Sequence, residues 1–154
     1  MTTIPPEWRP HKAIWTGWPS AADLWGEDLE PARAEVAAMI RALWDGGRGD
    51  KMRVLAHGRE AEATAKLALG QAAEVIPGAF GDIWFRDTGP IFDSAGVAHG
   101  FRFNGWGGKY QLPHDEEVGA RIALLAKADY RRHDFILEGG AIEMDGEGTL
   151  LTTR

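Results

Sequence analysis

The sequence contains no cysteine. This absence excludes disulfide bonds, metal sites built on thiolates, and any reaction that the chain would carry out with a thiol of its own. Its histidines are far apart in the sequence and include no i, i+4 pair, so their spacing does not indicate a metal site. They are His11, His57, His99, His114 and His133.

Long apolar runs and an excess of positive charge are also absent. No apolar run approaches the roughly 18 residues of a membrane span. The segment Met1–Pro6 lacks the basic and then apolar pattern of a signal peptide. The net charge of −6 argues against nucleic acid or an anionic membrane as a partner. We therefore expect a cytoplasmic protein, and a small cationic ligand is compatible with this charge.

The chain has 154 residues, of which 44% are hydrophobic and 26% are charged, so one stable domain is expected. Strands and helices alternate along it, which predicts the α/β class. Strands are expected at 13–18, 52–56, 74–77, 91–93, 97–103, 135–137, 141–144 and 149–153, and helices at 31–44, 59–69 and 115–127. The unit of hairpin, helix and strand is complete once, over 91–137, and begins again at Ala141, which indicates a repeated module.

Tryptophan is abundant, with seven residues in the chain. Four of them fall within the first 25 residues, where packing into a core is the simplest interpretation. Trp84 and Trp106 instead stand beside glycines and charged residues, so they are the better candidates for contact with a ligand.

The segment 81–90 concentrates groups that suit a flat cation. It contains Asp82, Trp84, Arg86 and Asp87 and ends in Gly-Pro. A carboxylate accepts a guanidinium through paired, charge-assisted hydrogen bonds, and an indole face attracts the same cation. The composition of this segment therefore favours a site for a guanidinium group.

Two carboxylates, Asp87 and Glu138, are expected where predicted strands end, which is where ligand sites of α/β folds collect. The two glycines after Glu138 leave the backbone open to a ligand. In the alternative interpretation, Asp87 caps a turn and pairs with Arg86 or Lys109, and Glu138 is a surface residue. Spacing alone leaves both interpretations open.

Five blocks, in order along the chain, resemble the agmatine deiminase and bacterial-type peptidylarginine deiminase family. They are residues 6–8 with 10–15 and 18–19, then 82–90, 103–109, 137–140 and 145–153. The resemblance implies the pentein fold, a β/α-propeller of five ββαβ modules. About two modules would be present, and residues 1–154 would be the N-terminal part of a single catalytic domain.

The resemblance also implies a reaction, the hydrolysis of a guanidinium to a ureido group with release of ammonia. Agmatine would become N-carbamoylputrescine, a step in putrescine biosynthesis, without a metal or an organic cofactor. Asp87 would bind the guanidinium, Trp84 would line the pocket, Glu138 would work beside a catalytic histidine, and Trp106 would lie near the aliphatic chain. The full set of implied site residues is Glu138, Asp87, Trp84, Trp106, Asp82 and Asn104.

The sequence departs from the family in one respect that affects chemistry. Family members are more than twice this long, and their His-x-Asp motif and nucleophilic cysteine come from later modules. We therefore expect a truncated chain that is inactive alone. A non-catalytic guanidinium-binding protein is the alternative from another class, and a peptidylarginine deiminase or amidinotransferase is the alternative within the superfold. The sequence does not separate agmatine from peptidyl-arginine or free arginine, and it leaves open whether the protein forms a homo-oligomer.

Overall fold

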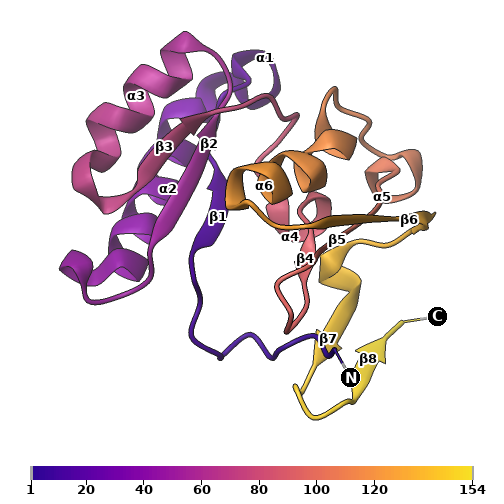
Figure 1. The fold of residues 1–154 in the computed structure, drawn as a ribbon. Helices are drawn as coiled ribbons and strands as arrows, with labels where there is room; N and C mark the ends of the chain where they lie inside the picture. The colour runs from indigo at the N-terminus through magenta and orange to yellow at the C-terminus, as the bar shows by residue number, and fades with distance from the viewer. Residues whose placement is uncertain (1, 154) are drawn as a thin grey trace. The chain divides into compact units, whose positions relative to one another are not determined.

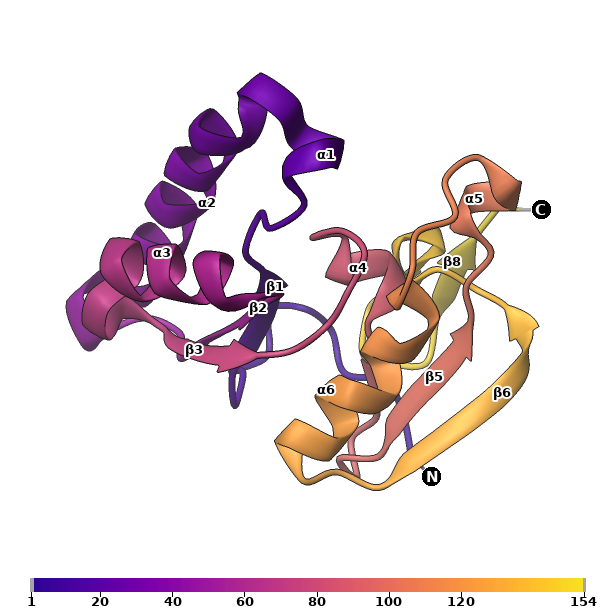
Figure 2. The same cartoon turned by 90° about the horizontal axis from the view of Figure 1, so that it is seen from above.

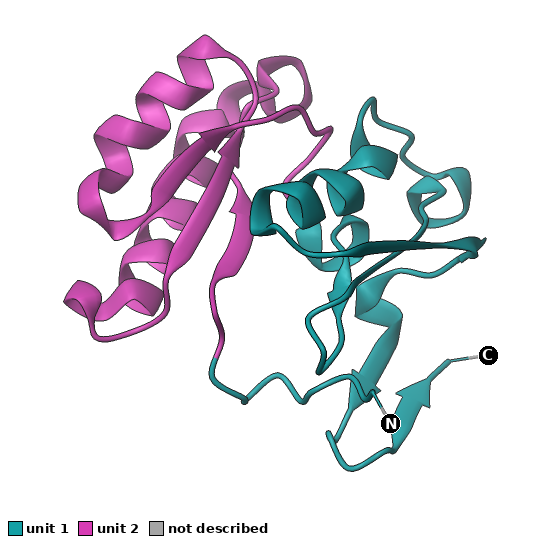
Figure 3. Ribbon diagram, viewed as in Figure 1, with its two compact units in different colours: residues 1–10, 84–154 teal, residues 11–83 magenta. Residues whose placement is uncertain are grey.

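The computed structural model describes residues 2–153. They form two compact units, which Figure 3 distinguishes by colour. Unit 2 is the continuous segment His11–Ile83, and unit 1 combines the N-terminal residues up to Pro10 with the chain from Trp84 onward.

Unit 2 contains a parallel three-stranded sheet and its connecting helices (Figure 1). The strands are β1 Ile14–Gly17, β2 Met52–Ala56 and β3 Glu74–Pro77, in the order β1-β2-β3. The α-helices are α1 Ala22–Trp25, α2 Leu29–Trp44 and α3 Arg59–Leu69, and the 3-10 helices are η1 Gly26–Asp28, η2 Asp45–Gly47 and η3 Gly70–Ala72. The sequence predicted β2, α3 and β3 with these same bounds.

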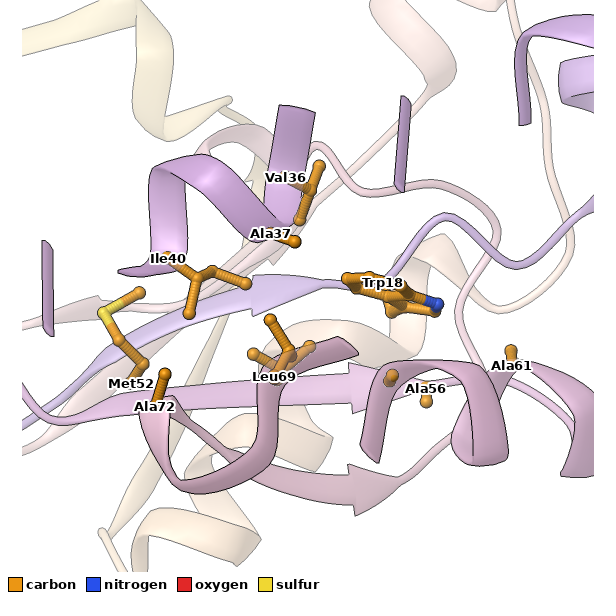
Figure 4. Close-up of a cluster of buried hydrophobic side chains, with 11 residues drawn as sticks. Trp18, Val36, Ala37, Ile40, Met52, Ala56, Ala61, Leu69 and Ala72 are labelled. Atoms are coloured by element: carbon orange, nitrogen blue, oxygen red, sulfur yellow. The ribbon is translucent and has the colours of Figure 1, made fainter. Parts of the chain in front are cut away.

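Both long helices of unit 2 cover one face of its sheet, as Figure 2 shows. The residues of β2 that alternate toward this face are Met52, Val54 and Ala56, and all are buried. Helix α2 presents Val36 and Ile40 to the same core. Figure 4 shows these side chains beside those from α3.

Trp18 completes this core directly after β1. It is 1% exposed, and its indole Nε1–H donates to the hydroxyl of Thr64 at 3.2 Å. A buried indole keeps its polar atom satisfied in this way. Core packing was the expected role for the early tryptophans, but only Trp18 is fully buried. Trp8 is 75% exposed, and Trp15 is half-buried beneath the guanidinium of Arg53.

Unit 1 contains a three-stranded sheet in the order β4-β5-β6 and a separate hairpin β7-β8. The strands are β4 Ile91–Phe92, β5 Ala98–Arg102, β6 Tyr130–Ile136, β7 Ile142–Met144 and β8 Leu150–Thr152. The α-helices are α4 Phe85–Thr88, α5 Gly105–Gly108 and α6 Val118–Ala126, and the 3-10 helices are η4 Asp115–Glu117 and η5 Gly139–Ala141.

The connection from β5 through α6 to β6 completes the predicted hairpin, helix and strand. Strand β4 pairs antiparallel with β5, and β5 pairs parallel with β6. Helix α6 buries Val118 and Ile122, and it packs on β5. The α/β class predicted from the sequence is therefore confirmed.

Two predictions of local structure were wrong in detail. Asp87 does not follow a strand but lies in the one-turn helix α4. Strand β6 begins five residues before the predicted Phe135. Within the described chain β6 is an edge strand that pairs with β5 alone, so its polar half carries no hydrophobic signal.

None of the helices within residues 2–153 has both the length and the apolar character needed to cross a membrane.

Candidate functional site

The one-turn helix α4 directs two candidate residues outward. The carbonyl of Trp84 accepts hydrogen bonds from the amides of Asp87 and Thr88, at 3.0 and 3.1 Å, and closes the turn. Phe85 and Thr88 face inward and are buried. Trp84 is 50% exposed and Asp87 is half-buried, so both present functional groups at the surface of unit 1.

The carboxylate of Asp87 meets the Glu-Gly-Gly block 53 residues further along the chain. Its Oδ1 accepts a hydrogen bond from the amide of Gly140 at 3.2 Å. A Cβ on Gly140 would lie 2.5 Å from that same oxygen, and a Cβ on Gly139 would lie 2.3 Å from the carbonyl oxygen of Arg86. Only glycine permits so close an approach between the two segments.

Glu138 stands directly before these glycines, at the point where the chain leaves β6. Its backbone is extended, and its side chain is half-buried. The turn η5 that follows it packs against α4. Two of the predicted blocks are thus adjacent in space, and Glu138 is not a fully exposed surface residue.

The cations that were considered as partners for Asp87 are engaged elsewhere. Arg86 forms ion pairs with Glu7 and with Glu143, the latter at 3.4 Å. The Lys109 ammonium lies 5.3 Å from the ring centroid of Tyr110. Within residues 2–153 no lysine or arginine pairs with Asp87. Its carboxylate therefore has a backbone donor on one oxygen and no cationic partner in the described chain.

The remaining candidates occupy other places. In unit 1, the Oδ1 of Asn104 accepts the amide of Gly107 at 2.9 Å and shapes the turn that carries Trp106. The Trp106 ring packs edge to face against Phe103, with centroids 4.9 Å apart. Asp82 belongs to unit 2, where its Oδ1 accepts the amide of the next residue at 2.8 Å.

A cleft of about 560 Å³ opens in unit 1 beside this turn. Its lining includes Asn104, Tyr110, Asp115 and Tyr130. Asp87 lies outside this lining, so the cleft and the carboxylate are separate features of the unit.

Sequence spacing missed a chain of hydrogen bonds between two histidines on neighbouring strands. His99 Nε2 lies 3.1 Å from the carboxylate of Asp93, and His99 Nδ1 lies 2.9 Å from His133 Nε2. Because an ionised carboxylate only accepts, His99 donates from Nε2; when the His99 ring is neutral, its Nδ1 accepts the hydrogen bond from His133. Nothing in the sequence indicated this contact, because His133 lies beside His99 only when β6 begins at Tyr130, before the predicted strand.

The hydrogen bond from His99 lowers the pKa of Asp93 below its ordinary value, and the backbone amides of Val97 and Ala95 add to this effect. In the part of the chain that is described, no group of three or more His, Cys, Asp or Glu side chains is placed to hold a metal ion.

Comparison with known proteins identifies the family. The sequence pattern of the Porphyromonas-type peptidyl-arginine deiminases matches residues 3–154. The chain belongs to this family. Within it, agmatine deiminases from Stutzerimonas stutzeri and Pseudomonas aeruginosa are 37% and 38% identical to this chain. Both alignments cover 98% of this chain and 43% of the relative, so the chain spans less than half the length of these relatives.

Solved structures of the family have the same fold over the region that this chain covers. An agmatine deiminase of Enterococcus faecalis superimposes with a TM-score of 0.89 at 27% identity, over 98% of this chain and 43% of that one. An agmatine deiminase of C. jejuni with substrate bound gives a TM-score of 0.85 at 26% identity, over 99% and 45%.

Proposed function

We propose that this chain is the guanidinium-binding part of an agmatine deiminase-type hydrolase. In this proposal Asp87 receives the guanidinium, the exposed ring of Trp84 lies against the same cation, and Glu138 faces the reacting group. Trp106 and Asn104 contribute to the rest of the substrate-binding surface of unit 1. The chain corresponds to the N-terminal part of a single catalytic domain and carries about two of the five ββαβ modules of a pentein propeller.

The main support for the proposal is the environment of the Asp87 carboxylate, its burial and its hydrogen-bond partner. A half-buried carboxylate with one backbone hydrogen bond and no cationic partner in the described chain is prepared to accept a cation. Its fixed partner, the Gly140 amide, holds one oxygen in place, so less ordering remains to be done when the ligand binds. The adjacent exposed indole adds a surface that attracts a guanidinium.

The proposed reaction consumes water and a guanidinium and yields a ureido group and ammonium. A thiolate attacks the guanidinium carbon, ammonia leaves, and water then hydrolyses the amidino-thiol intermediate and restores the thiol. The chain has no cysteine, so this thiolate must come from outside these 154 residues. We therefore expect the chain alone to bind agmatine and to form no ureido product.

The test is a titration of the isotopically labelled chain with agmatine, followed by NMR through the Gly140 amide and the Trp84 indole. Asp87→Asn keeps the shape and removes the charge. Because a hydrogen bond to a charged group contributes roughly 1.5–3 kcal/mol, we expect about ten- to a hundred-fold weaker binding in this variant.

Asp134→Asn is the matched control, since Asp134 is also in unit 1 and its side chain is 94% exposed. It should bind agmatine as the parent does, and circular dichroism should show that both variants fold. Equal binding by the parent and Asp87→Asn would contradict the role of Asp87.

A non-catalytic guanidinium-binding protein is the second candidate, because the residues proposed to bind the guanidinium lie within 154 residues that contain no cysteine. Both candidates predict that the chain binds agmatine. They differ in whether ureido product forms once another polypeptide of the family supplies the catalytic cysteine. Ureido product in a mixture of this chain with the remaining portion of a family member would support the hydrolase. Binding of agmatine without turnover in that mixture would support the second candidate. Peptidyl-arginine and free arginine, tested beside agmatine, address the substrate choice.

A further inference from the structure

The block Pro6-Glu7-Trp8 resembles the opening of the family, but the proposed function gives it no role. The structure places the arm that contains it, residues 2–10, in unit 1. At Thr3 the arm exchanges two hydrogen bonds with Ser94 in the β4-β5 turn. The Thr3 amide donates to the Ser94 hydroxyl at 3.1 Å, and the Ser94 amide donates to the Thr3 carbonyl at 2.8 Å.

A second attachment lies at Pro6. A Cβ built on Gly146 would fall 2.3 Å from the Cδ of Pro6, so the proline ring lies directly against the turn between β7 and β8. The arm is therefore attached to two turns before the chain reaches Glu7.

The third attachment reaches the candidate site. The Glu7 carboxylate pairs with the guanidinium of Arg86, and the same guanidinium pairs with Glu143 of β7 at 3.4 Å. These pairs join segments that are 79 and 57 residues apart in sequence. Arg86 thus connects α4 to the arm on one side and to the β7-β8 hairpin on the other.

Helix α4 needs such support because it is one turn long. An isolated turn of four residues does not hold its conformation in water, since nucleation costs more than its few hydrogen bonds return. Adjacent residues of a helical turn point in different directions. Arg86 and Asp87 therefore reach different partners. The Arg86 guanidinium pairs with two carboxylates, and the Asp87 carboxylate accepts the Gly140 amide.

We propose that Glu7, Arg86 and Glu143 form a positioning cluster that orients α4 and aligns Asp87 for the guanidinium. The inference rests on the proposed function for its ligand. Arg86 acts through its neighbour and does not touch the substrate. The side chains of all three residues are about half exposed or more, so the cluster contributes to orientation more than to overall stability.

The test is a double-mutant cycle on the full chain with Glu7→Gln, Arg86→Gln and the pair together. Each single variant should weaken agmatine binding about three-fold, in the range of a surface ion-pair network. The pair should be no worse than Arg86→Gln alone, because both substitutions remove the same interaction. Arg86→Lys, which keeps the charge, should recover part of the loss. Arg102→Gln is the control, since Arg102 is also half exposed and pairs weakly with Asp134 at 3.8 Å.

The Gly140 amide gives a second readout that needs no ligand. Its chemical shift and its hydrogen exchange report the bond to Asp87, and both should change in Arg86→Gln but not in Arg102→Gln. If the parent fails to bind agmatine, the proposed function fails while this amide still tests the cluster. Additive losses across the cycle, or a Gly140 amide unchanged in Arg86→Gln, would overturn the inference.

Discussion

At the scale of single residues, the candidate site depends on two glycines that permit close contact. Gly139 lies against the carbonyl of Arg86, and Gly140 lies against the carboxylate of Asp87. Neither has a positive φ, so an alanine could adopt the backbone at both positions. What excludes a side chain here is the space occupied by α4.

Gly140→Ala should therefore damage binding more than folding. The new methyl displaces the end of the Asp87 side chain, which can rotate away, so the loss of stability should be about 1 kcal/mol. Agmatine binding should weaken about ten-fold, because the displaced carboxylate no longer has its fixed position. Urea denaturation and NMR titration measure the two effects.

Gly119→Ala provides a matched control within unit 1. Its added Cβ would find nothing nearer than 3.6 Å, and the residue lies inside α6. Alanine there should leave agmatine binding unchanged and raise stability by roughly 0.5–1 kcal/mol. Undiminished agmatine binding by Gly140→Ala would mean that the contact with Asp87 does not matter for the site.

At the scale of elements, the hydrogen-bond chain from Asp93 through His99 to His133 links the β4-β5 turn to both β5 and β6. The side chain of Asp93 is 9% exposed, and its carboxylate also accepts the amides of Ala95 and Val97. The turn and the parallel pair β5-β6 thus share one polar connection.

This connection predicts a pH dependence with a defined sign. Because the pKa of Asp93 is lowered in the folded state, its ionised form stabilises the fold above the ordinary aspartate pKa of about 3.9. That contribution is lost as the pH falls through the lowered folded-state pKa. The free energy of unfolding of the parent should fall more steeply below about pH 4 than that of Asp93→Asn.

Denaturant midpoints at pH 7, 5, 4 and 3 would measure the effect. Asp134→Asn should follow the parent at every pH, since the Asp134 side chain is 94% exposed. Parallel pH profiles for the parent and Asp93→Asn would show that the folded-state interactions of Asp93 contribute nothing.

At the scale of the whole molecule, unit 1 exposes apolar side chains along its strands. Phe135 and Ile136 of β6 are 54% and 47% exposed, and Leu150 and Leu151 of β8 are 49% and 67% exposed. Within the described chain, β6 is an edge of its sheet and β8 pairs only with β7. Exposed edges with apolar side chains favour association with another polypeptide.

We therefore expect the purified chain to self-associate as its concentration rises, in sedimentation velocity or light scattering. Leu151→Lys should reduce this association, because a lysine on an edge strand opposes edge pairing. Leu67→Lys is the control, since Leu67 is 88% exposed but lies on α3 of unit 2. A monodisperse monomer across the concentration range would contradict this expectation.

The sequence by itself determined the elements that have strong local signals. Strand β2, helix α3 and strand β3 have the predicted bounds because hydrophobic periodicity and the stop at Gly70 are properties of adjacent residues. The five ordered blocks indicated the family, which the match over residues 3–154 confirms. The same blocks named Asp87 and Glu138 as candidates, which remains a prediction about function.

Only the tertiary structure decided which groups meet. Asp87 contacts Gly140, Arg86 pairs with Glu7 and Glu143, and His99 meets His133. Each of these contacts joins residues that are at least 34 positions apart in the sequence. Such partners depend on how α4, η5 and the edge strand β6 pack, and no local pattern of charge or hydrophobicity encodes that packing. The physical reason is that a side chain selects its partner by three-dimensional proximity, which the fold creates after the local elements have formed.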